Sequence, residues 1–271
     1  TLLAFLAERA IPGVESARDG VYRRTISLDG EAGVLEVHPG GQDHLLLCAH
    51  LPFWEGLIHV VERVGRIFGV DADMAPAEAA LADDPLIGPL IAARPGLRMP
   101  GAWGAFEIAV EAVLSQYDAR ARVREQLATV VEAAGRPVAG LDDGLTHLFP
   151  SARTLADTDL VTAGLPPTMA RTLHDLAATA ADDETLLDGG PGLVDFVAAL
   201  AAIPGIEDST AHRIALRLGH ADAFPAADRS LRATLARNDI VEAADQLAAR
   251  WQPWRAFAAT HLIAAGTPTA A

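Results

Sequence analysis

The chain has 271 residues, 51% of them hydrophobic and 21% charged, with a formal net charge of -15 at pH 7. This length and composition predict an ordinary globular protein with a sizeable core in a few packed units. No stretch approaches the roughly 20 uninterrupted apolar residues of a membrane span, so we expect a cytoplasmic protein with no membrane partner. The single cysteine, Cys48, excludes internal disulfides and cysteine-cluster metal sites, and we expect it to be a buried, reduced thiol.

The charged residues restrict the chemistry further. All 21 basic residues are arginine, so catalysis through a lysine Schiff base is excluded. The negative net charge argues against nucleic acid as a partner. However, residues 142–190 hold nine acids against two arginines, whereas residues 205–260 hold seven arginines against seven acids. The C-terminal part can therefore present a near-neutral surface, although we expect weak non-specific affinity for any DNA partner.

The predicted elements begin with a helix and a strand meander. Apolar residues at positions 2, 3, 5 and 6 suggest a short N-terminal helix. Residues 21–49 then alternate in the manner of strands, with DGEAG and GGQD as turns. Residues 52–70 have apolar residues at helical spacing. Residues 1–75 are therefore expected to form a small antiparallel sheet carrying helices.

From residue 75 onward strand signals nearly vanish, and alanine- and leucine-rich periodic segments follow one another between Gly and Pro residues. The sequence thus predicts an α+β fold, in which a helical bundle over residues 76–271 follows the N-terminal sheet domain. Helices are predicted near residues 76–81, 85–93, 103–115, 118–134, 144–147, 151–156, 159–163, 166–180, 192–200, 207–218, 226–235, 240–249 and 253–265.

The most informative segment is AALAAIPGIEDSTAHRIALRLG, residues 198–219. One helix is expected to end at the turn IPGI, and the next to begin near Asp208 or Ser209, either of which can cap it. Such a helix-hairpin-helix directs backbone N–H groups outward, and these can hold a DNA phosphate without a basic side chain. A plain helix-turn-helix corner is the alternative for the PG turn taken alone.

A second segment, DAFPAADRSLRATL, covers residues 222–235. Asp228 precedes an amphipathic helix that has Leu231 and Leu235 on its inner face. Taken in isolation, Asp228 is expected to cap the N-terminus of this helix.

The order of these motifs resembles the 3-methyladenine DNA glycosylase II branch of the helix-hairpin-helix DNA glycosylase superfamily. The chain reads IPGIEDSTA, then DAFPAAD, then ARWQPWRAFAATHL at residues 249–262. Upstream, AARPGLRMPGAWGAFEIAVEAVLSQ at residues 92–116 and FLAERAIPGVESARDGVYRRTISLDG near the N-terminus are also similar to that family. The similarity runs along essentially the whole chain.

The resemblance implies a monofunctional N-glycosylase of base-excision repair, which flips an alkylated or otherwise modified base out of double-stranded DNA. It implies a cleft between the two halves of the helical domain, with Asp228 as the catalytic carboxylate. That carboxylate would stabilise an oxocarbenium-like sugar and orient the attacking water. This chemistry requires the Asp228 carboxylate to be accessible. It must not be buried in the helical bundle, nor engaged wholly in capping the helix that follows it. We expect a monomer.

The resemblance also implies roles for further residues. The DNA-binding hairpin would comprise Ile203, Pro204, Gly205, Ile206, Glu207, Ser209 and Thr210. A wedge that fills the gap left by the flipped base would comprise Gln116 and Tyr117, and the base pocket would be lined by Trp103, Ser209, Arg213 and Ile263. No cofactor is expected, except that the backbone carbonyls of Ala201, Ile203 and Gly205 are candidate ligands for a structural monovalent cation.

Some residues have structural alternatives. Tyr117 can equally be a half-exposed tyrosine at a helix end. Trp251 and Trp254 are expected to be scaffold, with Arg255 paired to an acid and the proline of WQPWR starting a helix. His261 is expected to be a core residue. No histidine metal site is predicted from the remaining histidines.

Several positions depart from the family pattern. Glu207 stands where the hairpin usually has its second glycine, and Ser209, Arg213 and Ile263 replace aromatic residues near the pocket. Arg213 would oppose a cationic purine unless an acid such as Glu207 or Asp208 pairs with it. Two alternatives to the glycosylase therefore stay open: a non-catalytic damage-sensing DNA-binding protein, and an enzyme acting on a small-molecule N-glycoside or other metabolite.

Overall fold

The computed structural model describes residues 2–41, 44–70, 72–189, 192–240 and 243–267. The chain divides into two compact units, each built from two separate segments. The first unit comprises residues 1–64 and 103–185, and the second comprises residues 65–102 and 186–271. The predicted domain boundary between residues 75 and 76 stays a prediction. Among the described residues, no helix has both the length and the apolar character that a bilayer crossing needs.

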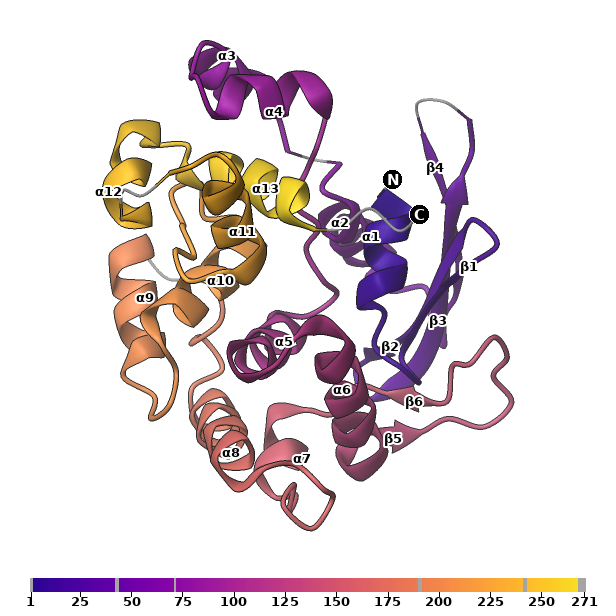
Figure 1. Ribbon diagram of the computed structural model, residues 1–271. Coiled ribbons are helices and arrows are strands. Elements are labelled where there is room, and N and C mark those ends of the chain that lie inside the picture. The colour runs from indigo at the N-terminus through magenta and orange to yellow at the C-terminus, as the bar shows by residue number, and fades with distance from the viewer. Residues whose placement is uncertain (1, 42–43, 71, 190–191, 241–242, 268–271) are drawn as a thin grey trace. The chain divides into compact units, whose positions relative to one another are not determined.

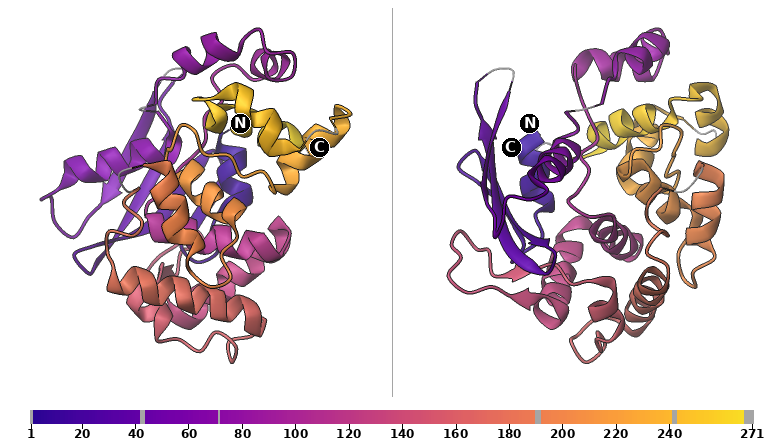
Figure 2. Two further views of the ribbon diagram at one scale, coloured as in Figure 1. Left: turned by 90° about the vertical axis from the view of Figure 1, so that its left-hand side faces the viewer. Right: turned by 180° about the vertical axis from the view of Figure 1, so that it is seen from behind.

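The first unit contains a four-stranded antiparallel sheet with strand order β1-β2-β3-β4. Its strands are β1 (Glu15–Arg18), β2 (Val21–Leu28), β3 (Glu31–Pro39) and β4 (Leu45–His50). Helix α1 (Leu2–Arg9) packs against β1 and β2 on one face of the sheet, as Figures 1 and 2 show. The predicted N-terminal helix and meander are thus confirmed, but the short strand β1 was not predicted.

The expectation that Cys48 is buried is wrong. Cys48 is exposed, and so are Leu46 and His50 on the same face of β4. The run LLLCAH suggested burial on both faces, but β4 is an edge strand. Cys48 lies opposite Glu36 of β3, whose charged side chain also faces outward in an ion pair with Arg23. The edge strand therefore keeps one open face despite its apolar sequence.

The rest of the first unit is mainly helical. It contains α5 (Ala105–Tyr117), α6 (Arg120–Ala134), α7 (Ala152–Ala156) and α8 (Pro167–Asp182), with a short ladder of β5 (Arg136–Pro137) and β6 (His147–Leu148). Helix α8 packs on both α5 and α7.

Two helices predicted in this unit are wrong. Residues 144–147 instead form a turn that leads into β6, because the amides of Thr146 and His147 both donate to the carbonyl of Gly13. Residues 159–163 are also a turn, in which the side chain of Asp159 accepts the amides of Val161 and Thr162. In both places other acceptors take the backbone amides that a helix would need.

The second unit is helical where the structure describes it. It contains α3 (Ala75–Leu81), α4 (Ile87–Ala93), α9 (Leu193–Ala201), α10 (Asp208–Arg217), α11 (Arg229–Arg237), α12 (Ala244–Ala248), the 3-10 turn η1 (Ala249–Trp251) and α13 (Arg255–Gly266). Helix α13 packs against α11 and α4, and α9 packs against α10. Helix α2 (Leu57–Phe68) begins in the first unit and ends in the second. Part of the helix predicted at 240–249, residues 241–242, lies outside the described residues.

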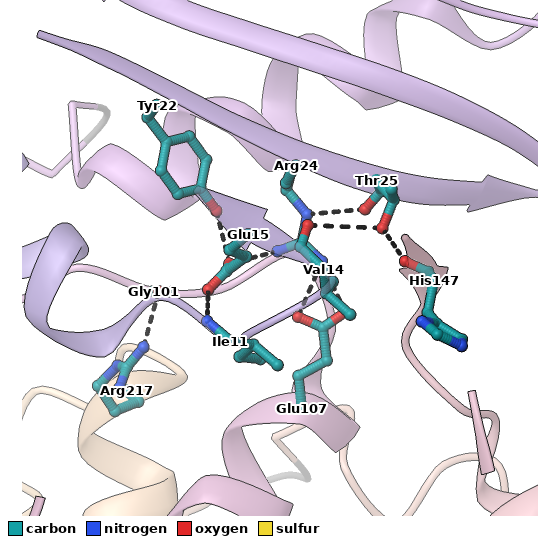
Figure 3. Close-up of polar contacts among 10 residues, drawn as sticks. All are labelled: Ile11, Val14, Glu15, Tyr22, Arg24, Thr25, Gly101, Glu107, His147 and Arg217. Atoms are coloured by element: carbon teal, nitrogen blue, oxygen red, sulfur yellow. Dashed lines mark hydrogen bonds and ion pairs between the residues drawn. The ribbon is translucent and has the colours of Figure 1, made fainter. Parts of the chain in front are cut away.

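A buried charged cluster joins the sheet to the helices of the first unit (Figure 3). Arg24 of β2, only 1% exposed, donates to both carboxylate oxygens of Glu107 on α5 at 2.8 and 3.0 Å. It also contacts Glu15 of β1 at 2.9 Å, and Glu15 accepts the hydroxyl of Tyr22 at 2.6 Å. Burial, the largest single influence, would lower the pKa of Arg24, but attraction by Glu107, Tyr22 and Glu15 together outweighs it and raises that pKa. Arg24 is therefore held charged.

We predict that Glu107→Gln lowers the free energy of unfolding by about 3 kcal/mol, because it breaks a buried ion pair and leaves Arg24 with only Glu15 as a carboxylate partner. The control is Glu125→Gln, which breaks the exposed Arg122–Glu125 pair at 2.6 Å. That change is expected to cost less than about 0.5 kcal/mol. Urea denaturation of the two variants measures the difference. Equal losses would contradict the structural role of the buried cluster.

Candidate active site

Asp228 stands at the N-terminus of α11 in the second unit. Its Oδ1 accepts the backbone amides of Ser230 at 2.8 Å and Leu231 at 2.9 Å. These bonds satisfy two of the amides that the first turn of a helix leaves without intrahelical partners. The expected capping role of Asp228 is therefore confirmed.

The second oxygen of Asp228 is also engaged. Its Oδ2 lies 2.5 Å from Nη2 of Arg213, which projects from α10. The Asp228 side chain is only 4% exposed, whereas the Arg213 side chain is 29% exposed. Because a guanidinium stays protonated, the two groups form a pair of zero net charge. The acid beside Arg213 is thus Asp228 itself, where the sequence had suggested Glu207 or Asp208.

One face of α10 holds the segment that leads to Asp228. Ser209, His212 and Arg213 have the i, i+3, i+4 spacing that puts side chains on one side of a helix. The Ser209 hydroxyl accepts the amide of Ala227 at 2.9 Å. His212 Nδ1 accepts the amide of Phe224 at 3.2 Å. Burial lowers the pKa of His212, which favours the neutral ring that this acceptor role requires.

The hairpin between α9 and α10 forms as predicted, but the cap expected from Asp208 or Ser209 is wrong, because α10 begins at Asp208 after Glu207 without a side-chain cap. Gly205 has a φ of +87°, a conformation that favours glycine. Ile203 and Ile206 are buried and anchor the turn, while Pro204 and Glu207 are exposed. Thr210 is buried at the start of α10. The hairpin, Ser209, Arg213 and Asp228 are therefore brought together within one unit.

Other predicted site residues belong to the first unit or to the core of the second. Gln116 and Tyr117, at the end of α5, and Trp103 belong to the first unit. The Tyr117 hydroxyl lies 2.9 Å from Oγ1 of Thr172 on α8. The Trp103 ring is buried, with the guanidinium of Arg63 5.0 Å from its centroid. Ile263 is buried in α13 of the second unit. The roles assigned to these residues stay predictions.

The scaffold role of Trp251 and the expected acid partner of Arg255 are confirmed, whereas the expectation that the proline of WQPWR starts a helix is wrong. Trp251 is fully buried and donates from Nε1 to Asp84 at 2.9 Å. Arg255 makes two bonds of 2.7 Å to Asp222, at the start of the segment that ends in Asp228. Helix α13 begins at Arg255 and not at Pro253. His261 is a core residue, and burial lowers its pKa.

His212 and Asp222 position the site, but the sequence analysis did not identify them. The signal for His212 was its helical spacing from Ser209 and Arg213. Asp222 is the first residue of the motif DAFPAAD, but no role was assigned to it, because its partner Arg255 lies 33 residues further along the chain. Among the described residues, no group of three or more His, Cys, Asp or Glu side chains could hold a metal ion.

The sequence is 33% identical to DNA-3-methyladenine glycosylase 2 of Escherichia coli, over 96% of this chain and 91% of that protein. The chain belongs to this family. Residues 1–104 also match the family model described as the AlkA N-terminal domain. The resemblance inferred from the ordered motifs is therefore confirmed, and the altered residues Arg213 and Glu207 occur in a genuine member of the AlkA family.

Two further comparisons place the chain. It is 37% identical to the probable bifunctional transcriptional activator/DNA repair enzyme AlkA of Mycobacterium tuberculosis, over 95% of this chain and 52% of that protein. The chain thus spans about half the length of this relative. The 3-methyladenine DNA glycosylase structure from Archaeoglobus fulgidus superposes with a TM-score of 0.83 at 18% identity, covering 98% of this chain and 93% of that one. The predicted fold class is confirmed.

We predict that Asp228→Ala lowers stability by about 1–3 kcal/mol, because it removes the acceptor for two amides and leaves Arg213 without its carboxylate. Asp228→Asn is expected to cost less, since the amide oxygen can still cap α11. Urea denaturation of both variants tests the difference. The exposed cap Ser151→Ala, which loses the 3.1 Å bond from the Thr154 amide, provides a reference of about 1 kcal/mol. Equal costs for the two Asp228 variants would contradict the capping role.

Proposed function

We propose that the protein is a monofunctional DNA N-glycosylase of base-excision repair, which hydrolyses the bond between a modified base and its sugar in double-stranded DNA. The observation that carries the proposal is the position of Asp228 at the start of α11, fastened through Ser209 and Arg213 to the second helix of the hairpin. Family membership supports the same activity. The residues of the hairpin and the aspartate belong to one compact unit.

The proposed reaction begins when the modified nucleotide is turned out of the duplex. The bond between C1′ and the base nitrogen breaks, and both electrons leave with the base. The Asp228 carboxylate stabilises the positive charge on the sugar and takes a proton from the water whose oxygen bonds to C1′. Because the sequence contains no lysine, no lysine Schiff base forms and the product is an abasic site.

The hairpin would bind the DNA backbone in this proposal. Backbone amides at the N-terminus of α10 can hold a phosphate, although the carboxylate of Glu207 beside them weakens the attraction. The carbonyls of Ala201, Ile203 and Gly205 are our proposed ligands for a monovalent cation. The Ile203 carbonyl accepts the Ile206 amide at 3.1 Å, and this leaves it one further lone pair. With a net charge of -15, DNA affinity is expected to be weak and steeply dependent on salt.

Asp228 is not accessible as expected, because its side chain is only 4% exposed, and this burial favours the alternative of a damage-sensing DNA-binding protein. Both of its carboxylate oxygens are occupied, one by amides of α11 and the other by Arg213. A protein that never releases this carboxylate would bind damaged DNA without cutting the glycosidic bond. In the proposed enzyme, Arg213 must move aside, and its partial exposure leaves room for that movement.

We predict that Asp228→Asn lowers the rate of base release from duplex DNA that carries a neutral or an alkylated modified base by about 100-fold or more, because the group that balances the sugar's charge is lost. Free base is measured after incubation with wild type and variant, and DNA binding is followed in parallel at several salt concentrations. The variant should bind DNA as the wild type does. Binding without release by either protein would favour the sensor, and neither binding nor release would favour a metabolite enzyme.

A further inference from the structure

We propose that Arg213 sets the substrate class of this site, favouring electrically neutral modified bases with hydrogen-bond acceptors over cationic alkylated bases. The inference rests on the proposed glycosylase function. It starts from the 2.5 Å contact between Arg213 Nη2 and Asp228 Oδ2 and from the unequal exposure of the two side chains.

The capping bonds decide which oxygen can act. Oδ1 of Asp228 is fixed by the amides of Ser230 and Leu231, so it cannot turn away without uncapping α11. Oδ2 is the oxygen left to face a sugar or a water, and Arg213 covers it. Asp228 is 4% exposed and held, while Arg213 is 29% exposed on the surface of α10. Arg213 is therefore the partner that moves.

The charge that develops on the departing base determines for which substrates Arg213 stabilises the transition state. A neutral base that leaves with both bonding electrons becomes negative until it gains a proton from solvent. A guanidinium nearby stabilises that charge and does not lose its own proton. A cationic base leaves as a neutral molecule, so Arg213 has no negative charge to stabilise. Before the bond breaks, Arg213 repels the cationic base.

Hydrogen bonding acts in the same direction. The planar fork of an arginine side chain matches a base edge that presents two acceptors, such as the O6 and N7 atoms of a purine. A base of this kind can accept hydrogen bonds from Arg213 in place of Asp228. Oδ2 of Asp228 then becomes free for the sugar. A base whose acceptor nitrogen is alkylated offers no such exchange. The pair then stays closed.

The test compares two duplexes that differ only in the target base, a neutral hypoxanthine or a cationic 7-methylguanine. Single-turnover rates of base release are measured for wild type, Arg213→Gln and Arg213→Lys. Wild type should release hypoxanthine faster. In Arg213→Gln the hypoxanthine rate should fall about 100-fold while the 7-methylguanine rate rises, so that the preference reverses. Arg213→Lys keeps the charge and should keep the preference at a lower rate.

Arg122→Gln provides the matched control, because it also removes an arginine from an ion pair, at an exposed position of α6 in the other unit. Its two rates should equal those of wild type. Faster release of 7-methylguanine by wild type, or an equal change of both rates in Arg213→Gln, would overturn the inference while leaving the glycosylase intact. Release of no base from either duplex or from other lesions would instead overturn the proposed function. If Arg213→Gln fails to fold, the preference of wild type and of Arg213→Lys for hypoxanthine over 7-methylguanine still tests the inference.

Discussion

The carboxylate of Asp228 serves two structural purposes at once, and the arrangement of the site depends on both. A charge that is almost fully buried must be paired and hydrogen-bonded, because its desolvation is otherwise costly. Two amides of α11 meet one oxygen and Arg213 meets the other. Through these contacts the same side chain starts α11 and ties it to α10. The position of the site is therefore a consequence of satisfying one buried charge.

A comparison of the Arg24–Glu107 and Arg213–Asp228 pairs shows why the second pair is suited to opening. Arg24 is 1% exposed, grips Glu107 through two bonds and also contacts Glu15, so its charge has no route to solvent. Arg213 contacts Asp228 through Nη2, and its side chain is 29% exposed. Removing the first arginine from its partner would leave a buried charge unmatched, whereas the second can exchange one partner for another.

The parts of this fold that could be predicted from the sequence are those with long periodic signals. The meander over residues 21–49 and helices such as α5, α6 and α8 have enough turns or alternations to stand out. β1 and the β5–β6 ladder are too short for periodicity. The false helices near residues 144 and 159 arose where other acceptors, the distant Gly13 carbonyl and the nearby Asp159 side chain, capture backbone amides. The exposure of Cys48 depended on which strand forms the sheet edge, which is a property of the tertiary structure.

The candidate site was predictable to a different degree. Ordered motifs located Asp228, the hairpin and Arg213, because family patterns are linear in the sequence. The contact between Arg213 and Asp228 was not predicted, since the path of the segment from Leu218 to Ala227 decides which acid reaches the guanidinium. That path is determined by the bonds of His212 to Phe224, Ser209 to Ala227 and Arg255 to Asp222. The last of these comes from a helix far along the chain.

Arg213 replaces an aromatic residue of the family pattern, and its pair with Asp228 limits which bases the proposed enzyme can accept. An equilibrium between a closed and an open pair shifts only toward the state to which the ligand binds better. A base that merely fills space gains nothing from the opening of the Arg213–Asp228 pair, because the cost of separating two close charges is not offset. A base that offers acceptors to the guanidinium, and becomes negative as it leaves, offsets that cost both on binding and in the transition state. The ion pair thus couples recognition of the base to exposure of the carboxylate.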